Sequence, residues 1–232
     1  NIPLVINTPF SICMSSTSAS LNKINYFDEE IIDSLYCPIH KDLNNNRFII
    51  NKTNDCNIVF LILESFGQEM IGYYNKGYEK SLTPFLDSLL NESLTFNGLA
   101  NGRRSIEALP SILCGIPSLM ATDLPSSRYA INRIDGFGNI LKHNGYTTSF
   151  FHGGNNGTMS FNTTSKSSGF DYYYGRDEYN NDSDYDGTWG IYDGPFLQYM
   201  AHKLNSFKEP FAATEENESR CSGDRLRITC RY

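Results

Sequence analysis

Three polar residues, Glu64, Ser105 and His152, each stand at or just after the end of a short hydrophobic segment. The carboxylate of Glu64 offers hard oxygen ligands for a divalent cation such as Mn²⁺ or Mg²⁺. A cation in contact with the Ser105 hydroxyl would lower the pKa of that hydroxyl and create an alkoxide-like nucleophile. These residue types therefore indicate a metal site formed by Glu64 and Ser105, with Ser105 as the catalytic nucleophile.

Basic groups next to Ser105 add the means to bind an anion. A guanidinium can pair with phosphate or sulfate oxygens through two parallel hydrogen bonds, and we assign this role to Arg104, with Arg103 as a second candidate. The N-terminus of the helix after Ser105 aims backbone N–H groups at the same anion. His152 could donate to this anion or hold a substrate hydroxyl. The set predicts transfer of a tetrahedral oxyanion group through a covalent seryl intermediate.

Each of these residues also has an ordinary structural explanation. A glutamate at a strand end is often only solvated, and a serine at a helix N-terminus is often only a cap worth about 1 kcal/mol. A histidine at a strand end often makes a structural hydrogen bond. The functional interpretation is favoured because all three residues follow consecutive βα units, whose strand ends meet at one rim of a parallel sheet.

The hydrophobic pattern predicts an α/β sandwich with a largely parallel sheet. Residues 57–64 form a continuous apolar run typical of a strand buried on both faces. Further strands are expected at residues 94–100 and 146–154. Helices are expected to start at Thr83–Pro84 and at Ser105, and to cover residues 136–145, closed by Gly145, and residues 193–207.

Composition excludes several classes of protein. The net charge of −7 over 232 residues provides no basic field for nucleic acid. The six cysteines include no C-x-x-C pair, so a zinc ribbon is not indicated, and most are expected to be free buried thiols. No apolar run reaches the 18 or more residues of a membrane span. The first residues do not fit a signal peptide, and we expect the sequence to be a fragment entered partway through.

Four segments carry a resemblance to a known family: NIVFLILESF, FFHGGNNGTMSF, YDGTWGIYDGPFLQYM, and the long stretch from TPFLDSLLNES through NGRRSIEALPSILCGIPSL. Together they resemble the lipoteichoic acid synthase and sulfatase-like proteins of the alkaline phosphatase superfamily, over roughly residues 1–212. The resemblance implies an alkaline-phosphatase-like αβα sandwich. It also implies that Glu64 is a metal ligand, that Ser105 is the nucleophile and touches the metal, and that Arg104 and His152 bind substrate.

The resemblance also implies an organisation for the chain. Residues 1–56 would be a lead-in after transmembrane helices that the sequence does not contain, and residues 57–212 the N-terminal portion of the catalytic domain. The resemblance implies Asp-His metal ligands and a His-rich segment downstream. The sequence after Phe211, AATEENESRCSGDRLRITCRY, contains neither. We therefore expect residues 213–232 to be an aberrant polar tail that does not pack, from a truncated or frame-shifted product that lacks the C-terminal part of the domain.

The predicted function is that of a metal-dependent phosphotransferase or sulfatase-like hydrolase acting on an envelope substrate. The expected substrate is a phosphate or sulfate ester that can be lipid-linked, and the resemblance implies a full-length protein in the inner membrane with its catalytic domain in the periplasm or outside the cell. Phosphoglycerol, phosphoethanolamine and sulfate esters all fit. Two alternatives remain open for this chain: an inactive envelope-binding module and a non-functional fragment.

Overall fold

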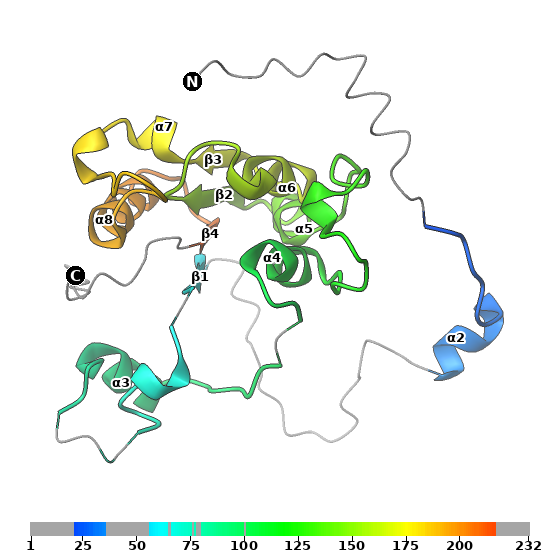
Figure 1. Cartoon of the computed structure of the whole chain (residues 1–232), viewed down its shortest axis with the longest axis horizontal. Helices are drawn as coiled ribbons and strands as arrows, with labels where there is room; N and C mark the ends of the chain where they lie inside the picture. The colour runs from blue at the N-terminus through cyan, green and yellow to red at the C-terminus, as the bar shows by residue number, and fades with distance from the viewer. Residues whose placement is uncertain are drawn as a thin grey trace. The chain divides into compact units, whose positions relative to one another are not determined.

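The computed structural model describes residues 21–35, 56–64, 66–75, 77, 80–99 and 101–216. The chain divides into two units, residues 1–54 and residues 55–232. In the first unit the described element is helix α2 (Glu29–Leu35). The second unit holds the described part of the sheet and the helices packed on it (Figure 1).

A four-stranded parallel sheet forms the centre of the second unit. Its strands are β1 (Ile58–Ile62), β2 (Thr147–His152), β3 (Tyr172–Tyr174) and β4 (Phe211–Glu216), arranged in the order β1-β4-β2-β3. All three pairings are parallel, which confirms the prediction of an α/β fold with a largely parallel sheet. Two of the strands, β1 and β2, lie within the segments predicted from the sequence.

The prediction of a short strand at residues 94–100 is wrong. Residues 94–99 have no regular secondary structure, and residue 100 lies outside the described residues. The side chains of Phe96 and Leu99 are 85% and 99% exposed. An apolar run becomes a strand only where a neighbouring strand accepts its backbone hydrogen bonds, and the described sheet offers this segment no such partner.

Strand β1 was expected to be buried on both faces, and this expectation is also wrong. In the described part of the chain β1 is an edge strand that pairs with β4 alone. The side chains of Val59, Phe60 and Leu61 remain 39–46% exposed. The apolar run does form a strand, but its burial depends on neighbours that the pattern of residues does not specify.

Strand β4 corrects the predicted start of the polar tail. Every residue from Phe211 to Glu216 is buried, although we expected no packing from residue 213 onward. The reason is positional: β1 and β2 flank this segment and pair with it on both sides, so its backbone hydrogen bonds are satisfied whatever its side chains. Residues 217–232 lie outside the described residues, and for them the expectation stays a prediction.

The four predicted helices are present and start within one residue of their predicted positions, but the last ends at Leu204 instead of residue 207, and the helices at 161–167 and 176–179 were not predicted. These helices are α3 (Pro84–Asn91), α4 (Ser105–Cys114), α5 (Phe137–His143), α6 (Phe161–Ser167), α7 (Arg176–Tyr179) and α8 (Asp193–Leu204). Thr83 is the N-cap of α3 and Pro84 its first residue, as predicted. Gly145 follows α5 with a φ of +86°, the left-handed conformation that commonly ends a helix.

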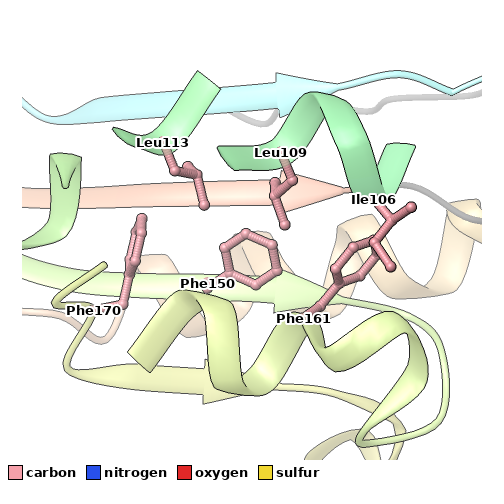
Figure 2. Packing of buried hydrophobic residues seen from close by; sticks show 6 residues of the cluster. All are labelled: Ile106, Leu109, Leu113, Phe150, Phe161 and Phe170. Carbon is pink, nitrogen blue, oxygen red and sulfur yellow. The ribbon is translucent and has the colours of Figure 1, made fainter. Parts of the chain in front are cut away.

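Two hydrophobic clusters place helices on opposite faces of the sheet. Consecutive residues of a strand point to opposite faces, so Phe150 and Phe151 of β2 enter different clusters. Phe150 packs with Ile106, Leu109 and Leu113 of α4 and with Phe161 and Phe170 (Figure 2). Phe151 packs with Ile191 and with Phe196 and Met200 of α8. The sheet therefore lies between a layer containing α4 and a layer containing α8.

One acidic residue of β4 is buried within this frame. Glu215 is 2% exposed and pairs with Phe151, so its side chain lies on the α8 face. Burial raises the pKa of Glu215 to about 8, and the nearby charge of Asp193 adds to the shift. The folded chain therefore keeps a proton on Glu215 at pH values where an unfolded chain releases it.

We predict that Glu215→Gln removes a pH dependence of stability. The raised pKa means that the contribution of Glu215 is fully present below its ordinary value of 4.5 and is lost as the pH rises through about 8. The glutamine stays neutral, so above pH 8 the variant should exceed the parent by a few kcal/mol in free energy of unfolding, since one pKa unit is worth about 1.4 kcal/mol. Urea denaturation of both proteins near pH 4.5 and above pH 8 measures the difference. The exposed Glu92→Gln is the control, and an equal pH dependence in all three proteins would contradict the prediction.

Candidate active site

The carboxyl ends of three strands meet at one rim of the sheet. The strand register places Glu216, the last residue of β4, level with Ile62 of β1 on one side and with His152 of β2 on the other. Residues directly opposite each other across a ladder point to the same face. Ile62 packs on the cluster that contains α4, so all three side chains lie on the α4 face of the sheet.

Ser105 lies at the same end of the sheet. It is the first residue of α4, and its neighbour Ile106 packs beside Phe161 where the strand arrows end (Figure 2). Phe161 in turn contacts the ring of His152 edge to face, with ring centroids 4.8 Å apart. The structure thus places the start of α4 and the end of β2 on the same face at the carboxyl end of the sheet.

The N-cap of α4 is Arg104, not Ser105. Arg104 has extended backbone dihedrals and makes no side-chain capping hydrogen bond, and Ser105 already belongs to the first turn. Ser105 is half-buried. The N–H groups of Glu107 and Ala108 both donate to the carbonyl of Arg104, and the first N–H groups of a helix lack the partner four residues back, so the start of α4 offers backbone donors next to Ser105. The ordinary explanation of Ser105 as a helix cap does not account for its place.

Arg104 is held by two carboxylates. Its Nε and Nη2 donate to Oε1 of Glu107 at 3.0 and 2.7 Å, and Nη2 also donates to Oδ1 of Asp123 at 3.2 Å. These carboxylates raise the pKa of Arg104. The pKa of Glu107 is lowered, first by the backbone N–H of Arg103, which donates to Oε2 at 2.7 Å, and then by Arg104. The guanidinium that sequence analysis assigned to the substrate is thus engaged in ion pairs.

His152 is enclosed by its neighbours. Its ring has no exposed surface, its Nδ1 lies 3.1 Å from the hydroxyl of Tyr173, and its Nε2 lies 3.6 Å from Oε2 of Glu216. Glu216 is also buried, at 1% exposure. Sequence reasoning missed both partners of this histidine. Glu216 falls in the segment assigned to the polar tail, and Tyr173 on β3 carries no local signal that distinguishes it from its tyrosine neighbours.

Glu64 lies two residues beyond the end of β1 and is exposed. Within the described ranges, no three His, Cys, Asp or Glu residues come close enough together to hold a metal ion. Glu64 and Ser105 have the right donor atoms for Mn²⁺ or Mg²⁺, but they do not make a complete site with the other described residues. The described part of the chain therefore does not by itself fit the metal.

Comparison with known proteins decides the family. A family model described as Sulfatase matches residues 56–214, which include β1, α4 and β2. The chain belongs to the sulfatase family. The resemblance found in the sequence is thereby confirmed. Within the described residues, no helix is both long enough and apolar enough to cross a membrane.

Similar proteins are known in enterobacteria. The chain is 32% identical over 163 residues to the phosphoglycerol transferase I proteins of Salmonella paratyphi B and Salmonella newport, and the match covers 65% of this chain and 20% of each relative. This sulfatase-family chain therefore spans about a fifth of the length of these curated relatives.

Two solved structures share the fold. An alkaline phosphatase superfamily protein from Vibrio parahaemolyticus is 26% identical, with a TM-score of 0.60 over 69% of this chain and 39% of that chain. The lipoteichoic acid synthase LtaP from Listeria monocytogenes has a TM-score of 0.56 at 21% identity, over 70% of this chain and 40% of that chain. Both confirm the alkaline-phosphatase-like fold.

We predict that Gly102→Ala disturbs the start of α4. Gly102 has a φ of +105°, and a Cβ added there would lie 2.6 Å from Cβ of Glu107, the residue that holds Arg104. Strain of this kind costs about 1–3 kcal/mol, so the melting temperature should fall. Gly98→Ala is the matched control, because an added Cβ meets nothing within 4 Å there. Equal melting temperatures for the two variants, measured by circular dichroism, would contradict the prediction.

Proposed function

We propose that this chain carries part of the active site of a metal-dependent phosphotransferase or sulfatase-like hydrolase in which Ser105 is the nucleophile. The observation that supports this proposal most is the position of Ser105. It begins α4 beside the carboxyl ends of β1, β4 and β2, within the segment that matches the sulfatase family. Ligands of open α/β sheets bind outside the carboxyl ends of the strands.

The proposed chemistry is a double displacement. Oγ of Ser105 attacks the phosphorus or sulfur of the ester, its proton is released, and the alcohol leaves with the electron pair of the broken ester bond. A covalent seryl ester remains. Water or a second alcohol then attacks this ester and regenerates the serine, which gives hydrolysis or transfer. The N–H groups of the first turn of α4 stabilise the negative charge that develops on the oxyanion, together with one arginine of the pair Arg103–Arg104.

Two further residues belong to the proposal. Glu64 and Ser105 would contribute two ligands to Mn²⁺ or Mg²⁺, which would supply charge stabilisation and a lowered pKa for the serine hydroxyl. We assign the other ligands to sequence outside the described residues, so no step above is routed through the metal. His152 is proposed to act at the same rim. Direct contact with a substrate requires that its ring, buried here, become accessible.

The proposed substrate is a phosphoglycerol ester with a lipid-linked donor. Support comes from the relatives, which bear the name phosphoglycerol transferase I. A donor held in a membrane would place this domain at the envelope, anchored by a segment of the complete protein and facing the periplasm or cell exterior. An inactive binding module of the same fold remains the second candidate. The observation that favours it is the His152 ring, which has no exposed surface.

We predict that Ser105→Ala abolishes turnover of a phosphoglycerol ester with little effect on stability. The change removes the attacking oxygen but leaves the backbone of α4 intact, so unfolding should cost at most about 1 kcal/mol less than in the parent. Release of the alcohol is the activity measured, and a melting curve is the stability control. Ser93→Ala, at the exposed end of α3, should leave both unchanged. Near-parental turnover in Ser105→Ala would remove this serine from the mechanism.

We also predict that Glu64→Gln weakens the binding of Mn²⁺ at least about tenfold, equivalent to about 1.4 kcal/mol. The amide keeps the shape of the side chain but loses the charge that a hard cation requires. Calorimetric titration of the complete protein with Mn²⁺ measures this change without any assay of activity. Glu92→Gln, at the exposed C-cap of α3, is the control. An unchanged Mn²⁺ affinity in Glu64→Gln would mean that Glu64 is only a solvated surface residue.

A further inference from the structure

We propose that Arg103, and not Arg104, is the arginine that binds the oxyanion of the substrate. The inference rests on the proposed function only in taking the start of α4 as the place where the oxyanion lies. The two arginines are the two residues before Ser105, and the sequence alone favours Arg104 as the substrate-binding residue. The ion pairs of the described residues show that the two side chains have different surroundings.

The positive charge of Arg104 is neutralised by neighbouring carboxylates. Its single positive charge faces the carboxylates of Glu107 and Asp123, so the three side chains together carry a charge of −1. The donors Nε and Nη2 are already used on carboxylate oxygens. A phosphate or sulfate group that approached Arg104 would meet two like charges at close range, which disfavours binding.

Withdrawing Arg104 from these partners would also be costly. The carboxylate of Asp123 is 8% exposed, and Oδ2 accepts a hydrogen bond of 3.1 Å from the backbone N–H of Ser126 at the start of the 3₁₀ turn Leu124–Ser126. Removing the cation would leave this largely buried carboxylate with less compensation for its charge, so the melting temperature should fall. Arg104 therefore acts as a strut between the first turn of α4 and that 3₁₀ turn.

Arg103 has the opposite surroundings. Its side chain is exposed, and among the described residues no carboxylate forms an ion pair with it. Its backbone, in contrast, is fixed, because its N–H donates to Oε2 of Glu107 at 2.7 Å. A fixed backbone, with a guanidinium two residues before Ser105 that no described carboxylate engages, can offer two parallel hydrogen bonds to an anion at low cost. Glu107 thus occupies Arg104 and anchors Arg103 at the same time.

The test compares Arg103→Gln with Arg104→Gln. Calorimetric titration with inorganic phosphate measures binding, and a melting curve measures stability. Arg103→Gln should weaken phosphate binding at least tenfold and leave the melting temperature unchanged. Arg104→Gln should lower the melting temperature and change phosphate binding by less than twofold. Arg133→Gln, an exposed arginine whose nearest carboxylate is 3.8 Å away on Asp135, is the control and should alter neither.

A third variant tests the role of the carboxylate. Glu107→Gln keeps the hydrogen-bonding shape but releases the charge of Arg104. Combined with Arg103→Gln, it should restore part of the lost phosphate binding, because Arg104 then faces one carboxylate instead of two. Failure of this rescue would contradict the claim that Glu107 neutralises Arg104.

The outcomes separate this inference from the proposed function. Loss of phosphate binding in Arg104→Gln with parental binding in Arg103→Gln would overturn the inference, as would a parent that binds no phosphate at millimolar concentration. Ser105→Ala should bind phosphate like the parent while losing turnover. If Ser105→Ala keeps turnover while Arg103→Gln loses phosphate binding, the proposed nucleophile is wrong and the anion site at Arg103 stands.

Discussion

The parallel pairing of β4 between β1 and β2 is the interaction on which the rest of this unit depends. Without it, β1 and β2 would not belong to one sheet, because neither pairs directly with the other in the described structure. The pairing also sets the register that brings Ile62, Glu216 and His152 level at the carboxyl rim. The site is therefore a consequence of a strand whose side chains include three polar residues, Thr214, Glu215 and Glu216.

The alternation of side chains along β2 then decides which helix can reach the rim. Phe150 fills the cluster under α4, and Phe151 fills the cluster under α8. His152 follows on the α4 face, where its ring meets Phe161. Because Leu109 and Leu113 hold α4 on the same cluster, the first residue of that helix lies at the carboxyl end of the sheet, where we propose that the substrate binds. Core packing and the proposed chemistry are linked through this one helix.

A single acidic residue, Glu107, organises the charged groups at the start of α4. Glu107 accepts hydrogen bonds from the backbone of Arg103 and from the side chain of Arg104, and its position requires the close approach that Gly102 allows. A carboxylate in the first turn also suits the positive end of the helix dipole. One acidic residue thus shapes the entry to the helix and decides how the two arginines differ. Membership of the sulfatase family gives this arrangement its proposed use.

The sequence by itself determined those features that local chemistry controls. Proline at the first position placed the start of α3, a glycine with positive φ closed α5, and the motifs around Ser105 and His152 indicated the family and the rim. Tertiary structure alone decided what depends on neighbours far along the chain. The burial of β1 depends on the strands beside it, and the segment at residues 94–99 stayed irregular for want of a partner. Residues 213–216 form part of a central strand because β1 and β2 supply backbone partners on both sides. The polar side chains of this segment do not predict that pairing. Likewise, two adjacent arginines are equivalent in sequence, and only the folded positions of Glu107 and Asp123 make them different.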